Sequence, residues 1–541
     1  MTDKRAADIL AERLYQAGCR HAFGMPGGEV LTLVDALERA GIRFTLVKHE
    51  NAAGFMAEAS WHRTGAPGIV VATIGPGAMN AVNAIANAEQ DRVPVILLTG
   101  CVDADEAQTY THQVLDHQKV FDPITKATFR LTAASAGIMT DKALGIALEG
   151  RPGPVLIDVP ISVADAPSAP NSTAKGLQHR PAASAVAPVG TDLTLARGWL
   201  ATSKRPVMII GLDAMNEGAG ATLLAFVEKH NVPFITTYKA KGIIPESHPL
   251  CLGAAGLSPL ADRSLVPFVQ SADLIICAGY DPIEMRPGWR QIWDPATVNV
   301  IDITAVPNHH YMHQATLNFV ADTAATLSAL SDAVPAQSTW SAGQVQTTQA
   351  ALSRAFDASE QWGPAAIVDE CRKNLPLTAL ASVDSGAHRI LLSQIWQCHE
   401  PRGLMQSSAL CTMGCAVPLA IGASIASPER VSVSFSGDAG FLMVAGELAT
   451  AAELGLKTIF VVFVDHSLAL IELKQRQRQM PNRGVDFATH DYAAIGRSFG
   501  GAGHQVSTRA ELAQALEVAQ QADTFTLIAA MIDRGAYDGR I

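Results

Sequence analysis

The stretch VSVSFSGDAGFLMVAGELATAAELGLKTIFVVFVD, residues 431–465, decides the fold of this chain. Its two ends, 431–436 and 458–464, are short β-branched runs with the length of buried strands. Residues 441–455 between them carry a helical pattern of Ala, Leu and Glu. A strand, a helix and a second strand in this order form a parallel β–α–β unit. We therefore predict a doubly wound α/β domain in which both strands end at the same edge of a parallel sheet.

Each strand of this unit delivers an aspartate to that edge. Asp438 stands in the turn Gly437-Asp438-Ala439-Gly440 that leads into the helix, and Asp465 directly follows the second strand. Backbone N–H groups at a helix N-terminus bind phosphate, but an acid there repels it unless a cation lies between them. Carboxylate oxygens suit Mg²⁺, which also takes phosphate oxygens and water. The pair predicts a metal that bridges the protein to a diphosphate, although each aspartate alone could simply cap a turn or a helix.

The same alternation of buried strands and helices runs through the whole chain of 541 residues. It loses its periodicity in the Pro-, Ser- and Ala-rich residues 167–190 and again near 331–345. We therefore predict three doubly wound parallel-sheet α/β domains, at residues 1–166, 191–335 and 360–541. No short repeat is visible, which excludes a solenoid.

Composition narrows the class of protein. Apolar residues make up 48% of the chain, charged residues 17%, and the net charge is -11 without any Lys/Arg-rich run, so we expect no nucleic-acid partner. No apolar run reaches the roughly 18 residues that a membrane helix needs. The N-terminal residues MTDKRAADILAERLYQAG form an amphipathic helical pattern rather than a signal peptide. The eight scattered cysteines, without CxxC pairs, suit reduced thiols. We expect a soluble, cytoplasmic protein.

The third block carries a longer motif. G-D-A-G-F, a helix containing E-L-A-T-A, and a strand end V-D-H-S followed by L-A-L-I resemble the thiamine diphosphate motif, and the chain is similar to the acetolactate synthase-like family of thiamine diphosphate-dependent enzymes. The resemblance implies that Mg²⁺ is bound by the side chains of Asp438 and Asp465 and by the backbone carbonyl of Ser467. It also implies cofactor contacts at Gly437, Ala439 and Leu468. Ala439 replaces the usual glycine, and Asp465 takes the place of the more common asparagine, as in catabolic acetolactate synthases.

Two segments upstream extend this resemblance. Cys411-Thr412-Met413-Gly414, followed by VPLAIGASIA, resembles the family's G-T-M-G…P-A-A-I-G-A segment. It implies that Met413 supports the bent cofactor between its two rings and that the Cys411 carbonyl accepts a hydrogen bond from the aminopyrimidine. A methionine outside such a motif is more often part of a core. His388 in DSGAHR matches a position that contacts the diphosphate.

The first block supplies the base in this family. KHENAA resembles R-H-E-x-x-A, and the resemblance implies that Glu50 hydrogen-bonds the pyrimidine ring and promotes deprotonation of the thiazolium carbon. An acid in the first turn of a helix also has a purely structural explanation in the helix dipole. HAFGMPGGEVL and ATIGPGAMNAV resemble the family's glycine loops around that glutamate, which implies cofactor contacts at Pro26, Gly27 and Asn80.

One segment points to the substrate. THQVLDHQKVFDPITK resembles F-Q-E-V-D…P-I-T-K and implies that Gln113 lies on the substrate side of the site. His112 replaces the family's phenylalanine. It either brings a titratable catalytic group to the site or is a tolerated planar side chain.

Taken with the motifs, the resemblance implies decarboxylation of a 2-oxo acid with carboligation to a second carbonyl, in a homodimer or homotetramer with active sites between subunits. A simple decarboxylase, a flavin-dependent pyruvate oxidase and a non-catalytic binding protein remain alternatives. FAD is doubtful, because residues 279–286 read GYDPIEMR where flavin-binding relatives have Phe-Asp-Asp-Arg. No tryptophan follows the Leu470-Ile471 pair, where anabolic synthases use one to select a second 2-oxo acid.

Overall fold

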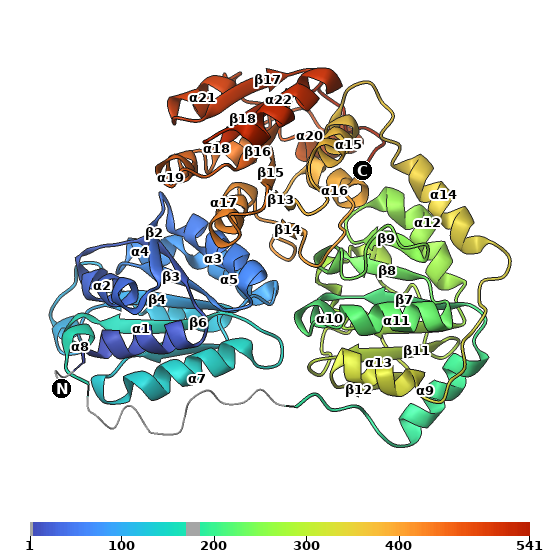
Figure 1. The fold of residues 1–541 in the computed structure, drawn as a ribbon, viewed down its shortest axis with the longest axis horizontal. Coiled ribbons are helices and arrows are strands. Elements are labelled where there is room, and N and C mark those ends of the chain that lie inside the picture. Colours follow the sequence, from blue (N-terminus) through green and yellow to red (C-terminus); the bar gives the residue numbers. More distant parts are fainter. Residues whose placement is uncertain (1–3, 169–183) are drawn as a thin grey trace.

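The computed structural model describes residues 4–168 and 184–541, arranged as three α/β units, each around a six-stranded parallel sheet (Figure 1). The predicted fold class is confirmed. Most of the predicted linker 167–190 lies outside the described residues, and the domain boundaries proposed from the sequence stay a prediction. Most strands are buried along their whole length, as expected for parallel sheets covered by helices on both faces.

The first sheet has the strand order β2-β1-β3-β4-β6-β5. Its strands are β1 (His21–Met25), β2 (Arg43–Leu46), β3 (Gly68–Ala72), β4 (Val95–Cys101), β5 (Ala127–Arg130) and β6 (Val155–Pro160). The helices of this unit are α1 (Ala6–Gln16), α2 (Leu31–Ala40), α3 (Glu50–Thr64), α4 (Pro76–Asn80), α5 (Val82–Gln90), α6 (His117–Phe121), α7 (Ala136–Leu148) and α8 (Ile161–Asp165).

The central sheet has the order β12-β11-β10-β7-β8-β9. Its strands are β7 (Pro206–Ile210), β8 (Phe234–Thr237), β9 (Cys251–Ala255), β10 (Leu274–Ala278), β11 (Asn299–Thr304) and β12 (Leu317–Val320). The helices are α9 (Thr191–Thr202), α10 (Leu212–Asn216), α11 (Gly220–His230), α12 (Pro259–Gln270) and α13 (Thr323–Ser331), and α14 (Gln344–Ala355) leads to the third unit.

The third sheet, β14-β13-β15-β16-β18-β17, repeats the connectivity of the first. Its strands are β13 (Leu380–Val383), β14 (Leu404–Gln406), β15 (Ser432–Gly437), β16 (Ile459–Val464), β17 (Ala502–Val506) and β18 (Thr526–Met531). The helices are α15 (Pro364–Asn374), α16 (Ala387–Ile395), α17 (Ala416–Ala426), α18 (Asp438–Leu442), α19 (Glu447–Glu453), α20 (Ala469–Gln477), α21 (Tyr492–Ser498) and α22 (Arg509–Gln521).

One local prediction was wrong. The stretch 441–455 does not form one helix after a turn at 437–440. Asp438 itself begins α18, and a break at 443–446 separates this helix from α19. Backbone bonds between residues three apart, Val444 N to Phe441 O (3.0 Å) and Glu447 N to Val444 O (2.9 Å), tighten the chain there. Gly446, a poor helix former, lies at the end of this break.

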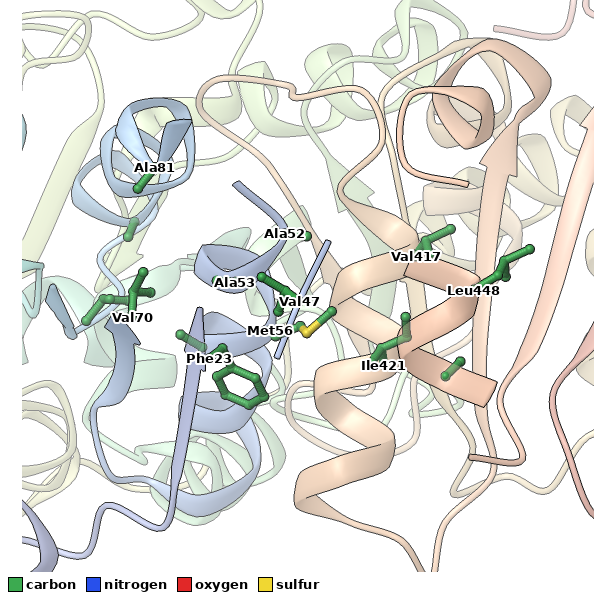
Figure 2. Close-up of a cluster of buried hydrophobic side chains, with 14 of the residues drawn as sticks. Phe23, Val47, Ala52, Ala53, Met56, Val70, Ala81, Val417, Ile421 and Leu448 are labelled. Carbon is green, nitrogen blue, oxygen red and sulfur yellow. The ribbon is translucent and has the colours of Figure 1, made fainter. Parts of the chain in front are cut away.

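The first and third units pack directly against each other. Helix α3 lies along α17, and one apolar cluster joins Met56 and Val47 of the first unit to Ile421 and Leu448 of the third (Figure 2). Gly422 makes this close approach possible, because a Cβ there would lie 2.6 Å from the Met56 carbonyl oxygen. The helix that begins at Glu50 is therefore held firmly against the helix that follows Met413.

Candidate active site

Three neighbouring strands of the third sheet place carboxylates at their carboxyl ends. Asp384 follows β13, Asp438 follows β15, and Asp465 follows β16. The Asp438 Oδ2 atom accepts hydrogen bonds from the backbone N–H groups of Asp465 (3.1 Å) and His466 (2.7 Å). The structure thus brings the two predicted metal ligands together at the sheet edge where doubly wound folds bind ligands.

The electrostatics of this pair favour a cation. Burial, together with the neighbouring Asp438 charge, raises the pKa of Asp465 to about 7, and burial also raises the pKa of Asp438. In the part of the chain that the structure describes, no group of three or more His, Cys, Asp or Glu side chains is arranged to hold a metal ion. Two carboxylates supplemented by a carbonyl, a diphosphate and water form a donor set that suits Mg²⁺.

A pocket of about 130 Å³ opens at this edge. The helices α16 and α18 both begin at its wall, and neither has a side-chain cap at its N-terminus. The N-terminus of α16 can therefore receive an anion, whereas the Ala439 N–H in the first turn of α18 already binds Asp438 Oδ1 (2.8 Å). Eight of the predicted site residues line the pocket: His388, Met413, Gly437, Asp438, Ala439, Asp465, Ser467 and Leu468.

Asp384 organises this pocket, and the sequence interpretation did not single it out. Its carboxylate is fully buried and lies 2.7 Å from His388 Nε2, while it accepts the N–H groups of Gly414 (2.8 Å) and Gly437 (3.3 Å). The His388 ring stacks on Phe463, with 5.5 Å between ring centroids. The available signal was an acid at the end of the strand ALASVD, four residues before the histidine.

The loop that carries Cys411 and Met413 adopts a strained conformation. Cys411 has a φ of 53°, in the left-handed region that non-glycine residues rarely occupy. Its thiol donates to the Ser408 carbonyl (3.2 Å), and Arg389 Nη1 lies 3.0 Å from the sulfur. Cys411 is not among the residues that line the pocket, so we expect any ligand contact at this residue to come from its backbone.

The second cluster lies on the first unit, also at the carboxyl ends of strands. Glu50 is the first residue of α3 and is 4% exposed, and its Oε2 accepts a hydrogen bond from Asn80 Nδ2 (2.9 Å). A Cβ at Gly77 would lie 3.1 Å from Glu50 Oε1. Pro26 and Gly27 follow β1, and a Cβ at Gly27 would lie 2.2 Å from Thr73 Oγ1, so glycine is needed there.

Gln113 and His112 lie on the exposed edge of this cluster. Gln113 has a φ of 58°, in the left-handed region. Its Cβ would lie 3.0 Å from a Cβ added at Gly75, so the two residues are close neighbours. The His112 ring contacts Tyr110 edge-on at 6.2 Å. The sequence interpretation missed the buried His117. Its Nδ1 lies 2.9 Å from Asp158 Oδ1, and its Nε2 accepts a hydrogen bond from the Gly75 N–H at 3.4 Å.

Three sequence families match the three sheets in order. Residues 4–120 match "Thiamine pyrophosphate enzyme, N-terminal TPP binding domain", residues 193–330 match the central domain of these enzymes, and residues 384–530 match their C-terminal TPP binding domain. The chain is 31% identical to the acetolactate synthase isozyme 1 large subunit of Escherichia coli over 511 residues, which cover 91% of this chain and 88% of that protein. The chain belongs to the acetolactate synthase family of thiamine pyrophosphate-dependent enzymes.

Two further relatives agree with this assignment. The acetolactate synthase of Bacillus subtilis is 29% identical over 98% of this chain and 94% of its own length. The catabolic acetolactate synthase of Raoultella terrigena is 28% identical over 97% of this chain and 95% of its own length. The predicted enzyme class and its thiamine diphosphate (thiamine pyrophosphate) cofactor are therefore confirmed.

Within one chain of this acetolactate synthase-like enzyme, the two clusters do not form one pocket. The pocket at Asp438 is lined by residues of the third unit, and Glu50 is not among them. Large apolar side chains lie exposed near both clusters, on the first unit at Leu31, Leu46 and Tyr110 and on the third unit at Met443 and Ile471. The described residues contain no helix that is long and apolar enough to cross a bilayer.

The central unit carries buried carboxylates just past the carboxyl ends of β7 and β10. A Cβ at Gly211 would lie 2.4 Å from the Gly279 carbonyl oxygen, so the ends of β7 and β10 are in contact. Asp213 in the first turn of α10 is buried and binds Arg151, with Nη2 2.9 Å from Oδ2. A second carboxylate, Asp281, lies 3.1 Å from the same guanidinium. Carboxylates at a helix N-terminus repel a pyrophosphate, so the start of α10 is unfavourable for one.

Proposed function

We propose that this enzyme uses thiamine diphosphate and Mg²⁺ to decarboxylate a 2-oxo acid and to join the remaining acyl unit to a second carbonyl, as an acetolactate synthase-like carboligase. The observation that carries the proposal is the Asp438 and Asp465 pair beside the uncapped N-terminus of α16 in one pocket. A buried pair of carboxylates next to free N–H groups suits a metal–diphosphate better than it suits either ion alone.

Each residue has a role in this proposal. Asp438 and Asp465, with the Ser467 carbonyl, would hold Mg²⁺. His388 and the N-terminus of α16 would receive the diphosphate, and Gly437, Ala439 and Leu468 form the wall. Met413 would support the cofactor, and the Cys411 carbonyl would accept a hydrogen bond from the amino group of the cofactor's pyrimidine ring. When bound, thiamine diphosphate supplies a carbon nucleophile that adds to the 2-oxo carbonyl and takes up the electron pair left by CO₂.

The first unit supplies proton transfer and the substrate side. The buried Glu50 carboxyl, fixed by the Asn80 amide, holds or releases a proton at the pyrimidine ring, and Pro26 and Gly27 leave room for that ring. Gln113 and His112 face the substrate. We propose that His112 contributes to substrate choice, because its ring is exposed on the same edge.

A complete site requires a second copy of the chain. The pocket of about 130 Å³ is smaller than the roughly 300 Å³ or more that encloses a whole organic ligand. The exposed apolar residues Leu46, Tyr110 and Met443 support burial of both clusters in a homodimer or homotetramer, with Glu50 facing the partner's metal site. The free cysteines among the described residues are consistent with a cytoplasmic setting.

Carboligation, rather than decarboxylation alone, is favoured by the synthases to which the chain is similar over nearly its whole length. The buried carboxylates Asp213 and Asp281 near the strand ends of the central unit disfavour a flavin-dependent oxidase. The segment Glu472-Leu473-Lys474 after the Leu470-Ile471 pair lacks the acceptor-selecting tryptophan of anabolic synthases, which is consistent with a catabolic reaction on pyruvate alone.

The test is a panel of 2-oxo acids, each incubated with thiamine diphosphate, Mg²⁺ and enzyme, with and without an acceptor aldehyde. We expect CO₂ release from pyruvate with formation of acetolactate. Release of a free aldehyde without any ligated product would show that the enzyme is a simple decarboxylase and not a carboligase. No CO₂ from any acid, together with no cofactor binding, would overturn the proposal.

A further inference from the structure

The three units of the chain meet at one buried ammonium group. Lys239, in the short 3₁₀ turn Tyr238–Ala240 of the central unit, extends into the first unit. Its Nζ lies 3.0 Å from Glu58 Oε1 and 2.9 Å from Asp91 Oδ2. The three side chains are 6%, 2% and 1% exposed, so neither carboxylate is shielded by water. The ammonium of Lys239 lies between the two carboxylates and relieves the repulsion between Glu58 and Asp91.

Asp91 connects this lysine to the pocket loop of the third unit. Its two carboxylate oxygens accept the backbone N–H groups of Ser408 and Ala409, each at 2.9 Å. Charge-assisted hydrogen bonds of this kind are stronger than neutral ones. One side of Lys239 therefore holds the start of the loop that leads to Met413.

Glu58 connects the lysine to the same loop by a second route. Its Oε2 accepts from Asn87 Nδ2 (3.0 Å), and Asn87 Oδ1 accepts from the Ser407 hydroxyl (2.6 Å). That hydroxyl in turn accepts the Thr412 backbone N–H at 2.9 Å. Both routes end within residues 407–412. Their end points lie on either side of the strained Cys411 and directly before Met413, and Met413 lines the pocket.

We infer that Lys239 is a positioning residue for the cofactor site, which it reaches from the central unit through Asp91 and through Glu58, Asn87 and Ser407. The inference rests on the proposed function of the loop that carries Cys411 and Met413. Without the ammonium, two buried carboxylates must separate or take up protons, and both routes to the loop loosen. A central domain that takes no part in the chemistry thereby sets how tightly the site holds its cofactor.

The chain offers a matched control. Lys241, two residues further on, is also buried and binds Glu246 at 2.7 Å, and Glu246 accepts the Cys398 N–H in the third unit. Like Lys239, it is linked to the third unit through a carboxylate, but that link ends at Cys398, outside residues 407–413. A purely structural role would therefore affect Lys239→Met and Lys241→Met alike.

The experiment is titration of metal-depleted, cofactor-free enzyme with thiamine diphosphate and Mg²⁺, alongside the melting temperature and kcat. We expect both variants to melt lower than wild type, but only Lys239→Met to raise the cofactor Kd, by about ten-fold, and to lower kcat. Lys239→Arg should restore part of the affinity. A folded Lys239→Met variant with the wild-type Kd would overturn the inference.

Ser407→Ala keeps the inference testable if Lys239→Met does not fold. It removes only the hydroxyl between Asn87 and Thr412, so the enzyme should melt close to the wild type while its cofactor Kd rises several-fold. An unchanged Kd in this variant would exclude the Glu58 route. Failure of the wild-type enzyme to bind thiamine diphosphate would instead refute the proposed function, which separates the two outcomes.

Discussion

The Nε2 atom of His388 lies 2.7 Å from the buried Oδ1 atom of Asp384, which stands four residues earlier in the chain. This contact orients the imidazole at the wall of the pocket. The same carboxylate accepts the N–H groups of Gly414 and Gly437. We expect Asp384→Asn to weaken cofactor binding about ten-fold or more, because the amide replaces one acceptor by a donor facing those N–H groups. Calorimetric titration with thiamine diphosphate measures this. Asp369→Asn, at a partly exposed ion pair, is the control and should bind normally.

The two aspartates of the metal site should respond differently to substitution by asparagine. Asp438→Asn is expected to lower Mg²⁺ affinity strongly, because Asp438 Oδ2 and Oδ1 receive three backbone N–H groups that fix the carboxylate. Asp465→Asn removes the charge that repels Asp438 and should retain activity at saturating Mg²⁺. Activity measured against Mg²⁺ concentration after chelation tests both. Equal loss in the two variants would contradict the proposed division of roles.

Glu50→Gln should separate binding from turnover. The amide keeps the shape of the side chain and can still meet Asn80, so cofactor binding should survive, while kcat should fall by about 100-fold or more because no proton can be exchanged. Single-turnover assays with saturating cofactor measure the effect. Glu38→Gln, on the surface of α2, should behave as wild type. Normal turnover by Glu50→Gln would exclude Glu50 as the proton carrier.

Acid should destabilise the enzyme through His62. Burial lowers the pKa of His62 to about 4, so the ring is neutral in the folded state, whereas an unfolded histidine titrates near 6.5. Unfolding therefore takes up a proton below about pH 6.5, and the free energy of unfolding falls as the pH drops from there to about 4, by roughly 3 kcal/mol in total. Melting temperatures between pH 7.5 and 5 test this.

The control for this pH dependence is the exposed His490. His62→Gln should flatten the fall of melting temperature with acid, whereas His490→Gln should leave it unchanged. The same slope in all three proteins would show that other groups dominate the acid sensitivity.

The purified enzyme should lack bound flavin. The buried Asp213 and Asp281, both paired with Arg151, place carboxylates near the strand ends where a pyrophosphate would lie. We expect no flavin absorbance in the visible spectrum and no change in activity on incubation with FAD. Tight co-purification of FAD would contradict this.

Local pattern was enough to predict the class of fold and the sheet edge at which Asp438 and Asp465 meet. Strand length, the helix between two strands and the position of Asp438 and Asp465 are properties of neighbouring residues, and parallel connectivity then puts both acids at one edge. The same pattern failed at 443–446, where Gly446 and bonds between residues three apart break the expected helix. It also overlooked Asp384 and His117, because their partners are distant in sequence and only packing brings them together.

The sequence by itself determined that this chain is a three-unit enzyme of its family, and it named the acids that we propose for the cofactor site. Only the tertiary structure decided that Glu50 and the Asp438 pocket stay apart within one chain, and that Lys239 is linked through Asp91 to the third unit. These features depend on contacts between side chains far apart in sequence. Periodicity and spacing report only on neighbours along the chain, so they carry no information about such contacts.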